Sequence, residues 1–366
     1  MTPRLAAPLA AVLEASGAVD FFQTWDQLTG WWPRALWHPH HSPLAGLAGD
    51  PDSFHDAFVL GAIAAGATER MGLALSTDSI RRGPVELLQA MLSLSQAVDG
   101  RAIFMIGAGE AKQIRPFGYR RSEGLDRMRE LFRVTRLLLD ADGPIDYDGP
   151  FVTLRQGWIG AANQHPPEIW GVGGGPQLFD LAVGSAAGLA TAVPAAFPYP
   201  EQYEVHVRTV KQLLEAAGRD PETFGFGVWA CALVHKDEAV IRAAFDNPLL
   251  RFYGAVGGRL EQTAWEREGV EPVFPPDWHY ALKLLPSQLS GAEAQSIVDR
   301  ATPKMVAKSF LWGTPASVAG QLRDFVEAGA NWVTILDFLP AVRPLEESFS
   351  ALARSIEICR LLKTAG

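Results

Sequence analysis

The chain of 366 residues is poor in cysteine, in net positive charge and in long apolar runs. Two cysteines, Cys231 and Cys359, are too few for a disulfide framework or a zinc cage. Both lie in apolar stretches, where we expect buried side chains. The net charge of -9 offers no basic face for a general nucleic-acid role. The longest apolar run, 57–67, is far shorter than the roughly 20 residues that span a bilayer.

Several signatures of other protein classes are also missing. Residues 1–17 lack the charged-then-apolar pattern of a secretory signal, so we expect a cytoplasmic protein. No Gly-x-Ser-x-Gly elbow supports a hydrolase of that kind. His38, His40 and His41 share a loop but lack the further ligands of a zinc site, so we expect solvated side chains and no metal. The composition, 48% hydrophobic and 20% charged, is typical of a globular enzyme with a large core. We expect a small-molecule substrate and no membrane partner.

The stretch 73–110 organises the chain, because it contains two buried strands that end in loops of small or polar residues. Residues 73–76 and 103–106 are short apolar runs bounded by polar or glycine-rich segments, as buried strands should be. Between them, Pro84 suits the first turn of a helix and Gly100 suits its end. This order predicts a parallel sheet or barrel with its chemistry at the C-terminal ends of the strands.

The rest of the chain repeats the pattern of strand and helix. Seven such units are visible, with strands around Val19, Leu73, Ile103, Ile169, Leu189, Phe226 and Val333. A (β/α)8 barrel needs eight, and the chain starts in a helix, so we expect its first strand to be missing or atypical. We predict an α/β fold, namely a TIM barrel in one domain over 1–366. Prolines interrupt the pattern after Asn247, and we expect an insertion at about 246–300 that covers the barrel mouth.

Two glycine loops follow predicted strands, Gly107-Ala108-Gly109-Glu110 and the segment 171–176. Glycine lets a ligand approach the backbone, whose N–H groups can bind phosphate where a helix begins. The second loop is the better phosphate candidate, because a helix follows at once. Neither loop matches a nucleotide-binding fingerprint, and tight turns would explain both equally well.

Three side chains near these loops could carry chemistry. Glu110 follows a strand and could give a proton to a substrate, although a solvated loop carboxylate is an equally good interpretation. Asp26 and Trp31 share the loop after the first visible strand. An acid and an indole there suit a flat aromatic ligand, but Trp31 could instead belong to the core.

Taken together in order, these segments resemble the bacterial luciferase-like flavin and deazaflavin oxidoreductases. The resemblance is greatest to the coenzyme F420-dependent branch, which includes glucose-6-phosphate dehydrogenases, methylenetetrahydromethanopterin reductases and mycobacterial phthiodiolone ketoreductases. It covers nearly the whole chain. The matching segments are Trp25-Asp26-Gln27, Ser76-Thr77-Asp78-Ser79-Ile80-Arg81-Arg82-Gly83-Pro84, Gly107-Ala108-Gly109-Glu110 and Val172-Gly173-Gly174-Gly175-Pro176. Two further segments are most similar to the ketoreductases, Glu268-Gly269-Val270-Glu271 and Phe310-Leu311-Trp312-Gly313-Thr314-Pro315.

The resemblance implies a luciferase-like barrel, a homodimer and a deazaflavin at the C-terminal mouth. It implies a cis peptide bond at Ala74–Leu75 under the cofactor ring, a conformation that costs about 3–4 kcal/mol. It makes Glu110 the acid and Trp31 the indole that stabilises the intermediate. The residues that it places against the cofactor are Asp26, Ala74, Leu75, Thr77, Ala108, Gly109, Gln113, Val172, Gly173, Gly174 and Gly175.

One departure from the family pattern concerns the direction of the reaction. The sugar-phosphate dehydrogenases have a histidine base directly after the aspartate, where this chain has Gln27. An amide takes no proton at neutral pH, so Gln27 at this catalytic position favours reduction by the reduced deazaflavin over oxidation of an alcohol. A histidine of the loop 34–53 could replace the base, which keeps an alcohol or sugar dehydrogenase open. A monooxygenase that uses flavin mononucleotide (FMN) and a ligand-binding barrel without activity are also compatible with the sequence.

Overall fold

The computed structural model describes residues 2–364, which divide into two compact units. The first unit consists of residues 1–27, 54–190 and 210–225, and the second of residues 28–53, 191–209 and 226–366. Each unit is assembled from segments that are far apart in the sequence. The expectation of one barrel domain with a mouth-covering insertion stays a prediction.

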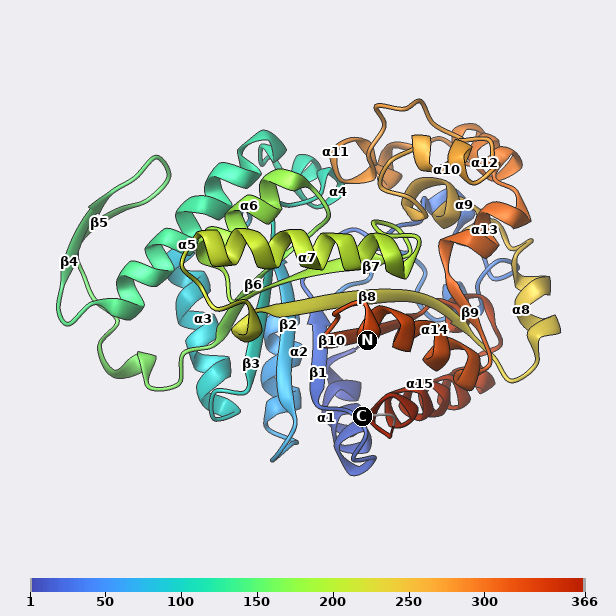
Figure 1. Ribbon diagram of the computed structural model, residues 1–366. Coiled ribbons are helices and arrows are strands. Elements are labelled where there is room, and N and C mark those ends of the chain that lie inside the picture. The colour runs from blue at the N-terminus through green and yellow to red at the C-terminus, as the bar shows by residue number, and fades with distance from the viewer. Residues whose placement is uncertain (1, 365–366) are drawn as a thin grey trace. The chain divides into compact units, whose positions relative to one another are not determined.

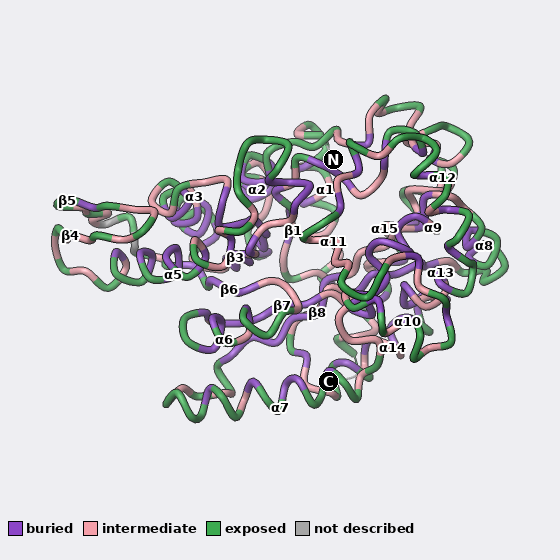
Figure 2. Tube along the Cα trace, turned by 90° about the horizontal axis from the view of Figure 1, so that it is seen from above, coloured by how far each residue is buried: buried purple, intermediate pink, exposed green. Residues whose placement is uncertain are grey.

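The first unit contains a parallel sheet in the order β1 (Phe21–Trp25), β2 (Gly72–Asp78), β3 (Ala102–Gly107), β6 (Glu168–Val172) and β7 (Gly188–Val193). Every residue of β2 is buried, as are the first five of β3. Figure 2 shows this burial along the trace of β3. Parallel strands covered on both faces need such continuous apolar runs, which is why 73–76 and 103–106 were recognisable in the sequence.

Helices follow the strands of this unit and pack against their neighbours (Figure 1). They are α1 (Pro3–Ala15), α2 (Ala57–Ala65), α3 (Pro84–Ala97), α4 (Ala111–Ile114), α5 (Gly124–Asp140) and α6 (Pro176–Ser185), while α7 (Pro200–Ala216) belongs to both units. Pro84 and Pro176 occupy the first turns of α3 and α6, as predicted. Two further strands, β4 (Ile145–Asp148) and β5 (Thr153–Gly157), pair in antiparallel as a separate hairpin.

The second unit contains β8 (Gly225–Val234), with which β9 (Leu311–Gly313) and β10 (Trp332–Asp337) pair in parallel. The remaining helices belong to this unit, and α9 packs on α12 and α13 while α14 packs on α15. They are α8 (Glu238–Ala244), α9 (Pro248–Gly257), α10 (Thr263–Arg267), α11 (Tyr280–Lys283), α12 (Gly291–Arg300), α13 (Pro303–Ser309), α14 (Pro315–Glu327) and α15 (Ser348–Lys363). None of the helices within residues 2–364 is long and apolar enough to cross a membrane.

We expected the first strand to be missing or atypical, but within residues 2–364 the eighth strand of the sheet is β9 rather than a strand before α1. β1, which follows α1 and pairs with β2, is the strand predicted around Val19. The strand that escaped notice is β9, since three residues between two helices carry no periodic signal. A second expectation was half right, because Cys231 is buried whereas Cys359 on α15 is only partly buried.

Candidate active site

The carboxyl ends of four neighbouring strands lie side by side in the first unit. The register pairs Trp25 with Ser76, Asp78 with Gly107, and Ile106 with Gly171. The segments that follow β1, β2, β3 and β6 therefore leave the sheet at one edge. In parallel α/β folds this edge is where ligands bind, because the strand-end loops converge there.

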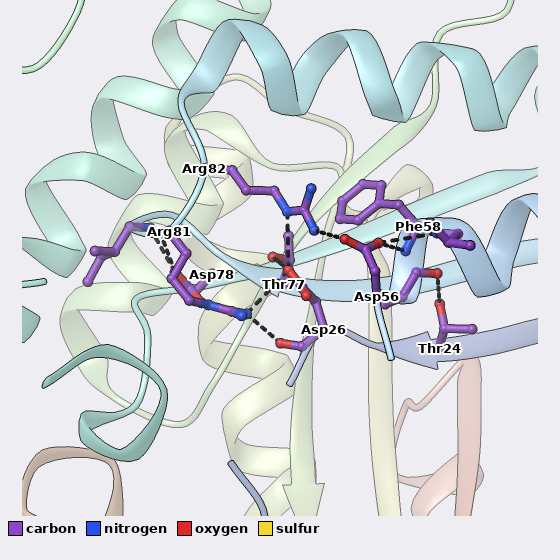
Figure 3. A network of polar contacts seen from close by, with 11 residues as sticks. Thr24, Asp26, Asp56, Phe58, Thr77, Asp78, Arg81 and Arg82 are labelled. Atoms are coloured by element: carbon purple, nitrogen blue, oxygen red, sulfur yellow. Dashed lines mark hydrogen bonds and ion pairs between the residues drawn. The ribbon is translucent and has the colours of Figure 1, made fainter. Parts of the chain in front are cut away.

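A buried network of charges joins the ends of β1 and β2 (Figure 3). One carboxylate oxygen of Asp26, Oδ2, accepts a hydrogen bond of 2.7 Å from Oγ1 of Thr77. The same oxygen lies 3.2 Å from Nη2 of Arg81 and 3.4 Å from Nε of Arg82. The side chains of Asp26 and Arg81 are 6% and 8% exposed, so this is a buried ion pair. Neither charge is well solvated by water, so each depends on its protein partners.

The two arginines also bind carboxylates of their own. Nε of Arg81 pairs with Asp78, whose other oxygen accepts the backbone N–H groups of Ile80 and Arg81, each at 2.9 Å. Nη2 of Arg82 pairs with Asp56 at 2.6 Å. These bonds tie the loop after β2 to both flanking segments and leave it little freedom.

The pairing of Arg82 with Asp56 perturbs both groups. Burial by itself would raise the pKa of Asp56, but hydrogen bonds from Arg82 and from the backbone at the start of α2 outweigh it and lower the pKa. Burial would likewise lower the pKa of Arg82, and its two carboxylate neighbours raise it instead. The guanidinium of Arg82 also lies 4.4 Å from the ring centroid of Phe58. Both side chains are drawn in Figure 3.

The loop after β3 turns sharply and then presents a carboxylate. Gly109 has φ of +83°, and a Cβ there would lie 3.1 Å from Ile114, so only glycine fits without strain. Glu110 is extended and caps nothing with its side chain. Its Oε2 lies 2.7 Å from Nζ of Lys112, whose side chain is fully buried, while the Glu110 side chain is 26% exposed.

The loop after β6 is open and made of small residues. Gly173 has φ of +149°, in the region that favours glycine. Gly175 is exposed, stands at the N-cap of α6, and has no atom within 4 Å of where its Cβ would be. Val172, Gly173 and Gly174 are partly exposed. Backbone of this kind at a helix start is accessible to an anionic group.

Comparison with known proteins gives this geometry a family context. Residues 34–331 match the model of the luciferase-like monooxygenase family. The chain belongs to this family. It is 29% identical over 319 residues to a phthiodiolone/phenolphthiodiolone dimycocerosates ketoreductase of Mycobacterium sp. strain JLS, covering 84% of this chain and 82% of the relative. It is 24% identical over 283 residues to the 5,10-methylenetetrahydromethanopterin reductase of Archaeoglobus fulgidus, covering 71% and 78%.

Solved structures show the same fold. An F420-dependent secondary alcohol dehydrogenase in complex with an F420-acetone adduct aligns with a TM-score of 0.73 at 18% identity, covering 99% of this chain and 96% of that one. A long-chain alkane monooxygenase aligns with a TM-score of 0.69 at 15% identity, covering 100% and 84%. The predicted luciferase-like barrel fold is thus confirmed, and the protein is a luciferase-like oxidoreductase.

The luciferase-like chain brings many of the predicted residues together. Asp26 and Thr77 are hydrogen-bonded, and Gln27 follows Asp26 in a partly buried position. Glu110 is joined through its backbone carbonyl to the N–H of Gln113 at 2.9 Å. The residues that lie along the strand-end loops are Ala108, Gly109, Gln113, Val172, Gly173, Gly174 and Gly175. Their roles toward a ligand remain predictions.

Two predicted residues lie inside a strand rather than in a loop. Ala74 and Leu75 are in the middle of β2 and are each 1% exposed. The predicted cis bond between them was wrong, since the one cis peptide bond within residues 2–364 is Val193–Pro194. The motif resembled the family's cis site, but local sequence alone does not determine that geometry.

The remaining predicted residues belong to the second unit. Trp31 packs on Tyr253 and Tyr280, with ring centroids 5.2 and 4.9 Å apart. Core packing is therefore part of what this indole does. The rings of His38 and His40 stack at 4.8 Å. Within residues 2–364 no group of three or more His, Cys, Asp or Glu side chains could hold a metal ion.

Sequence reasoning missed three cationic residues of the site, Arg81, Arg82 and Lys112. The adjacent arginines three and four positions after the strand-end Asp78 were a usable signal, because buried carboxylates require partners. Lys112 gave no signal, since a lysine in a polar loop is normally solvated.

Proposed function

We propose that this protein transfers a hydride from reduced coenzyme F420, a deazaflavin, to a carbonyl, imine or activated alkene of an apolar metabolite. The observation that carries the proposal is the Glu110 carboxylate, which is ion-paired with Lys112 and directly follows the glycine loop at the end of β3. A hydride acceptor needs a proton source at such a position. The similarity to a ketoreductase and to a methylenetetrahydromethanopterin reductase supports a reductase.

The cofactor proposal depends on whether the residues present fit a deazaflavin. The loop of Gly173, Gly174 and Gly175 offers exposed backbone without side chains, which suits a phosphate group. Asp26 would face the cofactor from β1, with its charge already shared with Arg81 and Arg82. Two solved structures of this fold are F420-dependent enzymes, and the fold also occurs with FMN, so the fold alone does not select the cofactor.

The residues of this chain would divide the work as follows. The bound deazaflavin supplies the hydride. The strand-end loops hold it, and Glu110 delivers a proton to the atom that becomes negatively charged as the hydride arrives. Gln27 orients polar groups but takes no proton, which favours reduction. Trp31 is the proposed indole contact of the reacting ligand.

The test is binding followed by turnover. Equilibrium dialysis of the purified protein against F420 and against FMN should show tighter binding of F420. Reduced F420 should then be oxidised in the presence of ketones, imines or enones, without oxygen. No F420 binding and no oxidation with any acceptor would refute the proposal. Tighter FMN binding with oxygen consumption would indicate a monooxygenase, and F420 reduction by alcohols or sugars would indicate a dehydrogenase.

Glu110→Gln separates an enzyme from a binding protein. We expect the variant to keep F420 binding and lose turnover by about 10²-fold or more. The matched control is Glu222→Gln, which removes another lysine-paired carboxylate of the first unit, 2.7 Å from Nζ of Lys211. Unchanged turnover in Glu110→Gln would remove Glu110 as the acid. Binding without turnover in every form would favour a ligand-binding barrel.

The homodimer implied by the family resemblance is also a proposal. Light scattering of the purified chain should give twice the 39.7 kDa of one chain. A monomer at micromolar concentration would refute it.

A further inference from the structure

Lys112 is unusual because a cation is buried directly behind a partly exposed acid. Its side chain has no exposed surface, and the whole of α4 around it is buried. Lysine is almost never fully buried unless its charge is paired. Here the partner is Glu110, with Nζ and Oε2 2.7 Å apart, a distance typical of a charge-assisted hydrogen bond.

The backbone explains how two residues only two positions apart can pair. Within a helix, residues i and i+2 point in different directions. Glu110 has φ of -115° and ψ of 143°, so it lies outside α4 in extended conformation, and its carboxylate can reach back to Lys112. The turn at Gly109 creates this arrangement, since it redirects the chain between β3 and Glu110.

An ion-paired carboxylate is a poor acid on its own, because it carries no proton to give. The ammonium of Lys112 carries three protons, one of which is directed at Oε2 of Glu110. We propose that Lys112 is the proton store of this site and that it protonates the substrate through Glu110. This inference rests on the proposed function, because it requires a substrate that takes up a hydride and a proton.

The transfer balances for a carbonyl substrate. The hydride from the reduced deazaflavin forms the C–H bond and places the electron pair on the carbonyl oxygen. An N–H bond of Lys112 breaks as its proton forms an O–H bond on Oε2 of Glu110, and that O–H bond breaks as the O–H bond of the product alcohol forms. Between the two transfers the ion pair is a neutral acid and a neutral amine, which burial tolerates better than separated charges. One proton is used in each turnover, and a proton from solvent restores the ammonium of Lys112 after the product leaves.

Burial assigns the order of the two groups. Lys112 reaches no solvent, so it cannot meet a substrate and acts as a positioning and proton-supplying residue behind Glu110. The side chain of Glu110 is 26% exposed, so it is the group from which the proton passes to the substrate. Removal of the lysine should therefore leave a site in which Glu110 acts only when it is itself protonated.

The experiment compares the wild type with Lys112→Met and Lys112→Arg. Methionine keeps the length of the side chain without the charge, and arginine keeps the charge but does not release its proton in proteins. For both we expect F420 binding close to wild type in equilibrium dialysis and a kcat lower by about 10²-fold at pH 7. In Lys112→Met, kcat should rise as the pH falls, because Glu110 then receives from solvent the proton that Lys112 no longer supplies.

Two further measurements check the control pair and the pairing of Glu110 with Lys112. Lys211→Met breaks the solvent-exposed pair with Glu222 at the same 2.7 Å and should leave kcat and its pH profile unchanged. In urea unfolding, Glu110→Gln and Lys112→Met should each destabilise the protein, and the double variant should be destabilised by less than their sum. If Lys112→Met does not fold, the kcat and F420 binding of Lys112→Arg are compared with those of the wild type instead.

The outcomes separate the two proposals. Wild type that neither binds nor oxidises the deazaflavin overturns the proposed function and the proton store with it. Wild type that turns over, together with Lys112 variants that have the same kcat and pH profile, overturns the proton store alone. So does a loss of kcat in Lys112→Met that stays constant from pH 4 to pH 8, because that would show a structural role.

Discussion

Asp337 gives a quantitative prediction, because one of its two carboxyl oxygens is buried without a hydrogen-bond partner within residues 2–364. It ends β10, and its Oδ1 accepts the backbone N–H groups of Val234 at 3.2 Å and Leu339 at 3.0 Å. Its Oδ2 is shielded from solvent and has no hydrogen-bond partner within the residues that the structure describes. The residue as a whole keeps some exposure through its other atoms. Replacement by asparagine keeps Oδ1 in place and removes only the ability to ionise.

The magnitude follows from the shift in acidity. Burial raises the pKa of Asp337 from 3.8 to about 7, and the two backbone N–H groups and the charge of Arg354 only partly oppose it. At about 1.36 kcal/mol for each pH unit, the difference corresponds to about 4 kcal/mol as an upper figure. Relaxation and water entry around a partly exposed residue reduce this, so we expect about 2 kcal/mol.

The sign sets the pH window. Below 3.8 the group is protonated in both the folded and the unfolded chain, and it has no effect on stability. Between 3.8 and about 7 the unfolded chain releases the proton while the folded chain keeps it, so folding is progressively disfavoured. Above 7 the penalty is complete. Asp337→Asn should therefore match the wild type near pH 4 and be more stable by about 2 kcal/mol at pH 8.

The assay is urea unfolding of both proteins between pH 4 and pH 8.5, followed by circular dichroism. The control is Asp324→Asn, which removes an exposed carboxylate from α14 in the same unit and should give a small difference that does not grow with pH. A stability gain in Asp337→Asn that is equal at all pH values would refute the reasoning. So would a loss of stability at pH 8, which would show that the charged form is paired, for instance with Arg354.

Three other predictions concern stability. Burial lowers the pKa of His206 from 6.5 to about 4, so folding should weaken by about 3 kcal/mol as the pH falls from 6.5 to 4, and His206→Phe should remove this dependence in urea unfolding. Glu268→Gln leaves the buried Arg259, 2.7 Å away, without its counter-charge and should cost about 3–5 kcal/mol, whereas Glu261→Gln at an exposed pair should cost less than about 1 kcal/mol. Gly109→Ala forces a side chain into a left-handed conformation and should lower the unfolding free energy by about 1–3 kcal/mol, and a cost near zero would show that the loop relaxes.

Much of the architecture was predictable because it depends on local signals. The apolar run of β2, the proline at the start of α6 and the Thr314 cap of α14 each act within a few residues. Oγ1 of Thr314 accepts the N–H of Ser317 at 3.2 Å, and a threonine followed by a proline is a local signal of such a helix start. The motifs of Asp26, Thr77 and Glu110 were likewise recognisable, since their order along the chain matches a family.

What only the tertiary structure decided depends on partners distant in sequence or on burial. β9 is a strand because β8 offers it a parallel edge, and nothing within its three residues required that. Arg81 meets Asp26 across 55 positions, and no local pattern reports such a pairing. Lys112 reads as an ordinary solvated residue until the fold buries α4 and leaves Glu110 as its ion-pair partner at the surface. The sequence determines which side chains are available. Burial and contacts between residues distant in sequence determine which of them form ion pairs and can take part in a reaction.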